Sequence, residues 1–442
     1  FYFARNMRKL QVSGITYNIN GQRSFKDDIF HWLTSEENLA ESELVCIALQ
    51  EVSHAEMFSA IPQASTWTAH ITEWMVEHGL LLVHRLCLAS NMLLVFGVQR
   101  ILHWIAKVDT RWSRNSYGGS AGYKGTMSVR LRFKNKLASI TFVTSHFFHG
   151  EKNFRKRIQQ YHSSLVCTFE DDLATTDIPR AVIWLGDLNS RVEGFTNSSE
   201  CNENDIDGIV QGFDQLTKSR RAGDAFVEFE EPTISFKPSY RIVVGDVVYD
   251  SHRIPSWCDR ILYKTANNVQ LAVERYSSCH QITISDHFPV SAVFQITLPH
   301  VNRPQLNNNF DPQESQQITP STSQVPSPSV AVQWNCQFDH IPTWMQHIPL
   351  VCRFQFHDDW YQNHGSYFDW LGVYPVNMVS ISKPMHWVYM LTCYNDLNVT
   401  NSKTVAEFPS LEPGLYVIGY YSVYSRCLQG LSEPFAVQEH LS

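Results

Sequence analysis

Several short apolar runs in this chain end in side chains that could carry out chemistry. The clearest case is the run 182–185, which is followed after Gly186 by Asp187 and Asn189. A carboxylate and an amide two positions apart point the same way from an extended backbone, so both can face one pocket while Leu188 stays in the core. Such a pair suits the activation and orientation of a water molecule. A turn rich in Asp and Asn that only ends a strand is the alternative interpretation.

Similar polar ends follow other predicted strands. The apolar run Leu44 to Leu49 delivers Gln50 and Glu51. A carboxylate at the end of a buried strand is either a salt-bridge partner or an oxygen ligand of the kind that Mg²⁺ prefers. Across the chain, the strand ends carry the following candidates: Asn18, Glu51, Asp187 with Asn189, Asp259, and Asp286 with His287.

If these side chains converge, they supply the parts of a phosphate-hydrolysing site. Those parts are a metal ligand, a water-activating carboxylate, an orienting amide and a histidine polarised by an aspartate, which can face charge developing on phosphate. An Asp-His pair with a second carboxylate could equally be half of a hydrolase triad. That alternative needs a nucleophile, and the sequence places none beside the pair.

The elements that must position these groups are mostly strands. Residues 12–18 alternate apolar and polar side chains, and residues 138–144 form an apolar run that ends at Ser145 and His146. The most hydrophobic region, 79–98, has about the length of a membrane span, but polar and charged residues interrupt it. We therefore expect two strands joined by a turn there. A helix with a basic start is expected over 152–165.

Composition indicates a globular protein of at least two domains. The 442 residues are 43% hydrophobic, and the net charge of −8 argues against a general nucleic-acid binder. Residues 1–299 are expected to form a catalytic domain, and 300–330, rich in Asn, Gln, Pro and Ser, a flexible linker. The segment 331–438 has short aromatic runs typical of a small antiparallel β sandwich. We interpret the ten scattered cysteines as reduced thiols of a cytosolic protein.

Two further stretches could meet a ligand or a membrane. The glycine-rich segment 117–125 contains Lys124, and its backbone could approach a phosphate. A second segment lies just past a predicted strand and is flanked by basic residues, which suits insertion into an anionic membrane, with a core helix as the alternative. Its large apolar residues are Ile101, Leu102, Trp104 and Ile105.

Four motifs, in this order along the chain, resemble those of the inositol polyphosphate 5-phosphatases. They are Leu49-Gln-Glu-Val52, Trp184-Leu-Gly-Asp-Leu-Asn-Ser-Arg191, Pro255-Ser-Trp-Cys-Asp-Arg-Ile-Leu262 and Ser285-Asp-His-Phe-Pro-Val290. The C-terminal segment resembles a SKICH domain through Asp369 to Pro375, Gly419 to Ser422 and Gly430 to Phe435. The order of parts is similar to that of the SKIP and proline-rich members of the family.

The resemblance implies a DNase I-like fold, a four-layer α/β sandwich of two mixed sheets flanked by helices, followed by an all-β immunoglobulin-like sandwich. It also implies Mg²⁺-dependent removal of the 5-phosphate from phosphatidylinositol 4,5-bisphosphate, the 3,4,5-trisphosphate or soluble inositol phosphates. The catalytic residues implied are Asp187, Asn189, His287, Asp259 and His146. Those implied to hold Mg²⁺ are Glu51, Asn18 and Asp286. Those implied to bind phosphate are Lys124, Tyr240, Arg241 and Arg260.

Some positions depart from the family pattern and are expected to affect substrate preference more than activity. They are Tyr123, Ser190, Pro232 and Arg241, of which the last replaces a lysine and could bind a ring phosphate through two hydrogen bonds. The expected partners are phosphoinositides at a membrane surface, soluble inositol phosphates and a protein bound by the C-terminal domain, with no nucleic acid. The expected location is cytoplasmic, with peripheral attachment to the plasma membrane or the endoplasmic reticulum.

Three other functions compete with this interpretation. A nuclease of the same fold class could use the same acidic and amide residues, although the acidic composition counts against it. A cysteine-nucleophile phosphatase is excluded because no cysteine has an arginine six positions later. A scaffold with an inactive catalytic domain is the third possibility, and the intact Glu51, Asp187 and His287 count against it.

Overall fold

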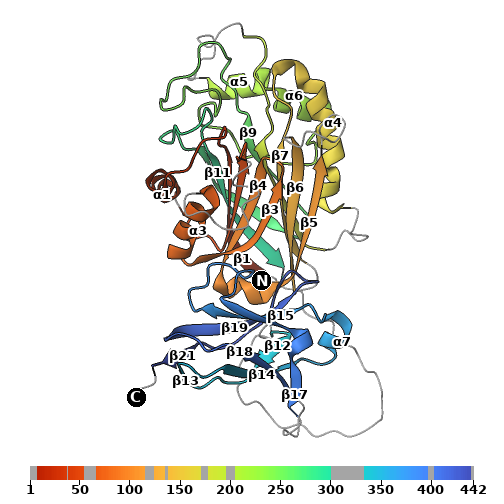
Figure 1. The fold of residues 1–442 in the computed structure, drawn as a ribbon. Helices are drawn as coiled ribbons and strands as arrows, with labels where there is room; N and C mark the ends of the chain where they lie inside the picture. The colour runs from red at the N-terminus through yellow and green to blue at the C-terminus, as the bar shows by residue number, and fades with distance from the viewer. Residues whose placement is uncertain are drawn as a thin grey trace, which may run out of the picture.

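A computed structural model places the chain in two packed domains (Figure 1). The residues that it describes are 7–36, 38–53, 66–114, 124–134, 138–170, 178–195, 205–299, 333–396 and 403–439. Tyr123, with most of the glycine-rich stretch before Lys124, and the predicted linker at 300–330 lie outside the described residues.

The first sheet of the N-terminal domain has six strands in the order β10-β11-β1-β2-β4-β3. Its strands are β1 (Met7–Asn18), β2 (Leu44–Gln50), β3 (Leu80–Leu88), β4 (Asn91–Val98), β10 (Gln270–Ser278) and β11 (Val290–Pro299). Strands β1 and β2 are parallel, so Asn18 and Gln50 end side by side. The hydrophobic region 79–98 forms β3 and β4, which confirms the prediction of two strands joined by a turn.

The second sheet has five strands in the order β5-β6-β7-β8-β9. Its strands are β5 (Ile105–Arg114), β6 (Gly125–Phe133), β7 (Ser139–His146), β8 (Arg180–Asp187) and β9 (Asp259–Thr265). Every residue of β7, and every residue of β8 after the first, is buried, as expected for strands covered on both faces.

Helices cover the outer faces of the two sheets, while the inner faces share one core. Residues such as Val12 and Ile183 belong to that shared core, so the sheets pack face to face. Helices α1 (Lys26–Ser35) and α3 (Trp67–Glu77) cover the first sheet. Helices α4 (Phe154–Ser164), α5 (Ile206–Phe213) and α6 (Gln215–Ala222) lie on the side of the second sheet (Figure 1). The predicted four-layer α/β sandwich and the helix expected at 152–165 are confirmed. No helix among the described residues is long and apolar enough to cross a membrane.

The C-terminal domain is a β sandwich, as predicted, with one short helix α7 (Trp360–His364). One sheet has the order β12-β14-β18-β17, and the other has the order β13-β21-β19-β15-β16 with β20 paired to β19. The strands are β12 (Cys336–Phe338), β13 (Trp344–Met345), β14 (Leu350–Phe356), β15 (Trp370–Pro375), β16 (His386–Tyr389), β17 (Tyr394–Asp396), β18 (Lys403–Phe408), β19 (Gly414–Ser422), β20 (Cys427–Leu431) and β21 (Phe435–Gln438).

The two domains pack directly against each other. Leu82 of β3 donates a backbone hydrogen bond of 2.9 Å to Val379, and Val108 of β5 donates one of 2.8 Å to Ser425. The side chain of Arg426 donates a 2.7 Å hydrogen bond to Thr110. Apolar residues of the C-terminal domain also join the core shared by the two sheets; among them are Tyr374, Met378, Ile381 and Leu428.

The proposed membrane tip at 101–105 is wrong. The segment forms a short 3-10 helix, η2 (Gln99–Trp104), that lies in the domain interface. Ile101, Leu102 and Ile105 are 0 to 2% exposed, and Trp104 is partly buried against the same core. The C-terminal domain covers the apolar surface that suggests a membrane contact. For example, Cys427 donates to the carbonyl of Ile105, over 300 residues earlier in the chain.

Candidate active site

The strand register of the second sheet brings three polar side chains to one end. His146 ends β7 and is paired with Asp187, which ends the parallel strand β8. Asp187 is paired in turn with Asp259, the first residue of the antiparallel strand β9. The three positions are therefore neighbours across three adjacent strands. All three residues are buried, with at most 1% of each exposed.

Gly186 allows the end of β8 to lie this close to β7. Its φ is +150°, and a Cβ atom at this position would lie 2.1 Å from the carbonyl oxygen of Ser145. No side chain fits at that distance, so the residue before Asp187 must be glycine. The break in the apolar run at Gly186, visible in the sequence, thus reflects close strand packing.

Asp187 accepts two hydrogen bonds and lies next to His146. Asn18 Nδ2 donates to its Oδ2 at 2.9 Å, and the backbone N–H of Asn189 donates to its Oδ1 at 3.0 Å. His146 Nε2 lies 3.3 Å from Oδ2. Burial alone would raise the pKa of Asp187, but the hydrogen bond from His146 and the positive charges nearby lower it below the ordinary value. Asp187 is therefore ionised at neutral pH.

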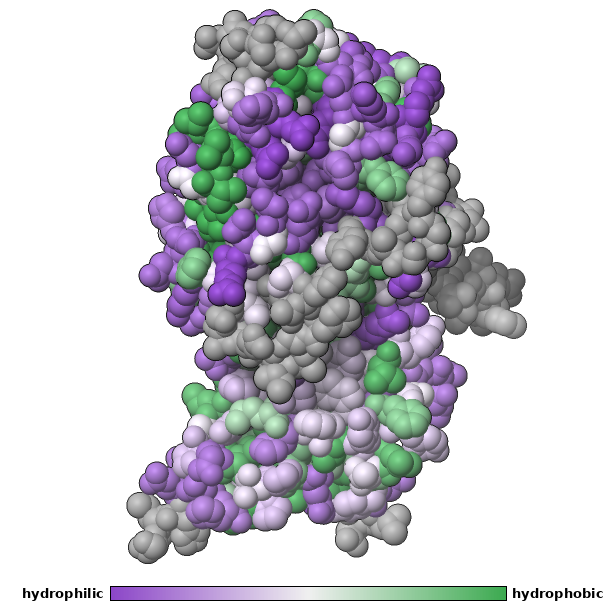
Figure 2. Space-filling model, turned by 45° about the horizontal axis from the view of Figure 1, so that its top comes forward, coloured by the Kyte–Doolittle hydropathy of each residue, from purple (hydrophilic) through white to green (hydrophobic). Residues whose placement is uncertain are grey.

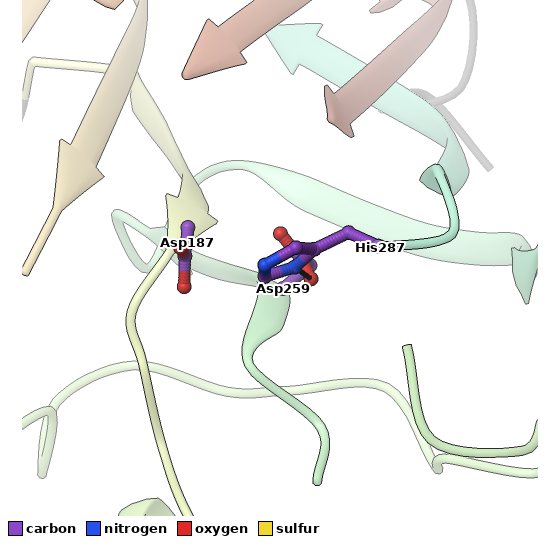
Figure 3. A group of neighbouring side chains, drawn as sticks. All are labelled: Asp187, Asp259 and His287. Atoms are coloured by element: carbon purple, nitrogen blue, oxygen red, sulfur yellow. Dashed lines mark hydrogen bonds and ion pairs between the residues drawn. The ribbon is translucent and has the colours of Figure 1, made fainter. Parts of the chain in front are cut away.

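Asp259 and His287 form a buried pair beside Asp187 (Figure 3). His287 Nδ1 lies 2.7 Å from Asp259 Oδ2, which also accepts a 2.8 Å hydrogen bond from Ser239. Because Nδ1 is used in this way, Nε2 is the ring nitrogen left to face the pocket. Burial opposes protonation, but the charge of Asp259 and its hydrogen bond outweigh it and raise the pKa of His287 to about 9. The ring is therefore an imidazolium at neutral pH.

Lys124 and His146 form a hydrogen-bonded pair beside Asp187. Lys124 Nζ is hydrogen bonded to His146 Nε2. Burial is the largest cause that lowers the pKa of each group, and the charge of Lys124 lowers that of His146 further. Lys124 lines the pocket, and its binding of phosphate stays a prediction. His146 lies against Asp187, at 3.3 Å.

Tyr240, Arg241 and Asp286 lie near His287. Tyr240 lines the pocket with its ring 4.5 Å from that of His287. Arg241 Nε lies 3.2 Å from Asp286 Oδ2, and about a third of the Arg241 side chain is exposed, 37%. Asp286, the residue before His287, thus pairs with Arg241.

The prediction that Arg260 binds phosphate does not fit its position. Its side chain is 0% exposed and donates two hydrogen bonds to Glu231, of 2.6 and 2.7 Å, and one to Asp214, of 3.0 Å. In a strand, neighbouring side chains point to opposite faces, so Arg260 points away from the side that Asp259 faces. Arg260 is a structural residue that ties β9 to the segments around Asp214 and Glu231.

The pocket formed by these groups has a volume of about 320 Å³. It also contains residues that the sequence analysis did not select: Arg191, His149, His252 and Arg253. The guanidinium of Arg191 lies 4.3 Å from the Tyr240 ring and donates to the Asn189 side chain. A basic residue two positions after Asn189 was the available signal for Arg191. For His252 and Arg253, the signal in the sequence was that two basic residues are adjacent.

Comparison with family models and with known proteins shows which family the chain belongs to. Residues 15–293 match the endonuclease/exonuclease/phosphatase family 2, and residues 336–437 match the SKICH domain. Type IV inositol polyphosphate 5-phosphatase 11 of Arabidopsis thaliana is 30% identical over 289 residues, which cover 63% of this chain and 80% of that protein. The chain belongs to the inositol polyphosphate 5-phosphatase family.

Other members of the 5-phosphatase family are longer than the matched region. Polyphosphatidylinositol phosphatase INP53 of Saccharomyces cerevisiae is 31% identical over 304 residues, or 65% of this chain and 26% of that protein. The type II inositol 1,4,5-trisphosphate 5-phosphatase of Mus musculus is 29% identical, again over 65% of this chain but only 30% of that protein. The chain therefore matches about a quarter to a third of these two relatives.

Solved structures show the same fold in proteins of different chemistry. The 5-phosphatase domain of a synaptojanin, in complex with inositol (1,4)-bisphosphate and calcium ion, matches 66% of this chain and 85% of its own with a TM-score of 0.54 at 24% identity. A Cimex nitrophorin, in a ferrous NO complex, matches 66% of this chain and 99% of its own with a TM-score of 0.53 at 23% identity. At this identity the likeness shows the fold alone, so function must be argued from the site.

The residues at the pocket fit the divalent cation that the 5-phosphatase family implies. Glu51 has a φ of +58°, which is uncommon for Glu. Its side chain is 40% exposed at the pocket, with a contact of 3.7 Å to His146. Asn18 and Asp286 add oxygen atoms to the same pocket, and such atoms suit a hard cation. Asp187, Asp259 and His287 also have possible ligand atoms within 4.8 Å of one another, but Asp259 and His287 already bond each other.

Proposed function

We propose that the chain is a Mg²⁺-dependent phosphomonoesterase that removes the 5-phosphate of phosphatidylinositol 4,5-bisphosphate, of the 3,4,5-trisphosphate and of soluble inositol polyphosphates. The observation that carries the proposal is the position of the ionised Asp187 beside the His287 imidazolium, with Lys124 lining the same pocket. A carboxylate that can activate water thus lies next to positive charge that can face a phosphate.

The basic residues of the pocket suit a substrate with several phosphates. Lys124, Arg191 and Arg253 all line the pocket, and Arg241 lies at its edge beside Asp286. Two or more phosphates on one ring offer more charge than a single phosphodiester, so this distribution favours inositol phosphates over nucleic acid. The acidic net charge of the chain supports the same choice.

Asp187 is placed to act on the attacking water. Its two oxygens accept hydrogen bonds from Asn18 and from the Asn189 backbone, which fix the carboxylate plane. An ionised carboxylate held in this way can accept the proton that water loses as it attacks phosphorus. An incoming phosphate dianion adds negative charge nearby and raises the proton affinity of Asp187, which favours this transfer.

His287 is placed to stabilise charge on the phosphoryl group. With Nδ1 bonded to Asp259, its protonated ring can donate from Nε2 to an oxygen of the phosphate in the transition state. Glu51, Asn18 and Asp286 would hold Mg²⁺, which, when bound, neutralises charge on the same phosphate. The protein groups thus surround the reacting phosphate from two sides.

Phosphate release from soluble inositol 1,4,5-trisphosphate, measured with Mg²⁺ and with EDTA, tests the proposal. We expect release with Mg²⁺ and none with EDTA. A phosphodiester substrate such as bis(p-nitrophenyl) phosphate serves as the control for a nuclease of the same fold. Hydrolysis of the diester without release from the trisphosphate would contradict the proposal.

A further inference from the structure

Four valines stand exposed on a hairpin beside the pocket. Val243, Val244, Val247 and Val248 are 49, 47, 59 and 56% exposed. Loops at a protein surface are usually polar, and clustered apolar residues on a surface commonly mark a contact with a membrane or a protein. We call residues 242–249 the valine hairpin.

The valine hairpin is held in one conformation by backbone hydrogen bonds. Val243 donates a 2.9 Å bond to the carbonyl of Val248, and Ile242 is bridged to Tyr249. Gly245, with a φ of +88°, makes the turn and donates a 2.7 Å bond to Thr283. The base is anchored because Ile242 is 1% exposed and donates to the carbonyl of Asp286.

Both ends of the valine hairpin continue into the pocket wall. Tyr240 lines the pocket two residues before it, and His252, Arg253 and Ile254 line the pocket just after it. Valines lie opposite each other across the two strands of the hairpin, so neither of its faces is polar. The preference of valine for strands does not by itself explain apolar side chains on both faces. Figure 2 shows hydrophobic surface gathered in a column beside a largely hydrophilic area on the upper part of the molecule.

Among the described residues Arg253 makes no ion pair, so it is the basic side chain beside the valine hairpin that can face an anionic surface. His252 and Arg253 are exposed just after it, and Arg241, just before it, is partly exposed. Two acidic groups face Arg241: Asp286 at 3.2 Å and Asp250 at 3.7 Å, of which Asp250 also lies 3.2 Å from His252. A third, Asp246 at the turn, accepts a 2.7 Å bond from Val247 N. The exposed Asp246 limits how deep the turn can enter an apolar phase.

We infer that the valine hairpin inserts at the headgroup level of an anionic bilayer and seats the pocket over a lipid headgroup. The choice of a lipid rather than a protein rests on the proposed function, because a phosphoinositide ring must enter the pocket while its acyl chains stay in the bilayer. The described part of the C-terminal domain does not cover the end of the sheets that carries His146 and Asp187. It contacts Leu82 and Ile105, and each of these lies toward the opposite end of its strand. The membrane contact that the sequence suggested at 101–105 is thereby assigned to a different segment.

Vesicle sedimentation of the full chain tests the inference without relying on catalysis. The vesicles contain phosphatidylcholine and phosphatidylserine and no phosphoinositide. The test variant carries Val243→Thr, Val244→Thr, Val247→Thr and Val248→Thr, which keep the β-branched shape and so the hairpin. The matched control carries Val166→Thr and Val227→Thr, two valines that are 45 and 58% exposed and do not line the pocket.

We expect vesicle affinity to fall by about tenfold or more in the test variant and to stay unchanged in the control. A second variant, Val244→Phe with Val247→Phe, should bind vesicles more tightly than the wild type, and this result does not depend on a destabilising change. Wild-type binding by the threonine variant, or no gain in the phenylalanine variant, would overturn the inference. A third outcome would also overturn the inference: the wild type dimerises, the threonine variant does not, and the threonine variant still binds vesicles.

The outcomes for the valine hairpin and for the proposed function are separable. If the wild type releases no phosphate from any inositol phosphate but the threonine variant loses vesicle binding, the proposed function fails and the membrane contact stands. If the threonine variant hydrolyses soluble inositol trisphosphate normally and still binds vesicles, the membrane contact fails and the proposed function stands.

Discussion

Asn18 Nδ2 donates a 2.9 Å hydrogen bond to Asp187 Oδ2 and so joins the end of β1 to the end of β8. The two residues are 169 positions apart and belong to different sheets. The orientation of the Asp187 carboxylate, which we propose activates water, therefore depends on how the two sheets pack. Substitutions in the shared core can thus reduce activity without any contact with the substrate.

Gly186→Ala should lower both activity and stability. The added methyl group would lie 2.1 Å from Ser145 O, so β8 must shift away from β7 at the position that orients Asp187. A cost of about 1 to 3 kcal/mol is typical of such overpacking. Gly212→Ala in α5 is the matched control, because a Cβ there meets nothing within 4 Å. Thermal unfolding and turnover of both variants give the answer, and normal values for Gly186→Ala would contradict the packing argument.

Arg260→Met should destabilise the fold rather than weaken phosphate binding selectively. The change leaves the carboxylates of Glu231 and Asp214 buried without their shared partner, which typically costs about 3 to 5 kcal/mol. Arg241→Met, at the edge of the pocket, should instead raise KM with little change in Tm. Denaturant unfolding together with steady-state kinetics separates the two. A stable Arg260→Met protein with raised KM would return Arg260 to the phosphate site.

Leu102→Ala should destabilise the protein and loosen the contact between the domains. Leu102 is 2% exposed and packs in the core cluster that includes residues of the C-terminal domain, so a loss of about 2 to 5 kcal/mol is expected. Leu391→Ala, at a position 68% exposed, serves as the control and should have little effect. An unchanged unfolding midpoint for Leu102→Ala, with weaker vesicle hydrolysis, would restore the membrane role predicted from the sequence.

Acidification should weaken the fold through His84 of β3. Burial, and then the charge of Arg426 in the C-terminal domain, lower the pKa of His84 from 6.5 to about 4. The unfolded chain therefore binds a proton that the folded chain excludes, so stability is complete above about pH 6.5 and is lost as the pH falls toward 4. His84→Gln should flatten the fall in Tm between these values. An equal pH slope in the variant would show that other groups cause it.

The residues at the strand ends could be predicted from the sequence because the signal is local. An apolar run followed by Asp187 or Glu51 shows in a few consecutive residues that a buried strand delivers a polar group to one edge. Asn18 ends β1 in the same way, whereas Asp259 begins β9 and Asp286-His287 lie just before β11. The parallel pairs β1–β2 and β7–β8 end together, and the antiparallel strand β9 begins at the same edge, beside Asp187.

The errors came from contacts that the local sequence does not contain. Arg260 lies inside a family motif, but its partners Asp214 and Glu231 lie well before it and set its role. Likewise, the apolar segment around Leu102 looks exposed until the C-terminal domain covers it. Strand alternation could have excluded Arg260 from the side that Asp259 faces. No comparable signal marked the domain interface.

The product formed from inositol 1,4,5-trisphosphate tests the central claim most directly. The wild type and Asp187→Asn are each incubated with the substrate and Mg²⁺, and the products are separated by ion-exchange chromatography. The wild type should yield inositol 1,4-bisphosphate, and the variant should be slower by about 10² to 10⁴ with an unchanged Tm, because its neutral amide cannot accept the proton of water. Loss of a different phosphate, or wild-type turnover by Asp187→Asn, would contradict the assignment of this site as a 5-phosphatase centre.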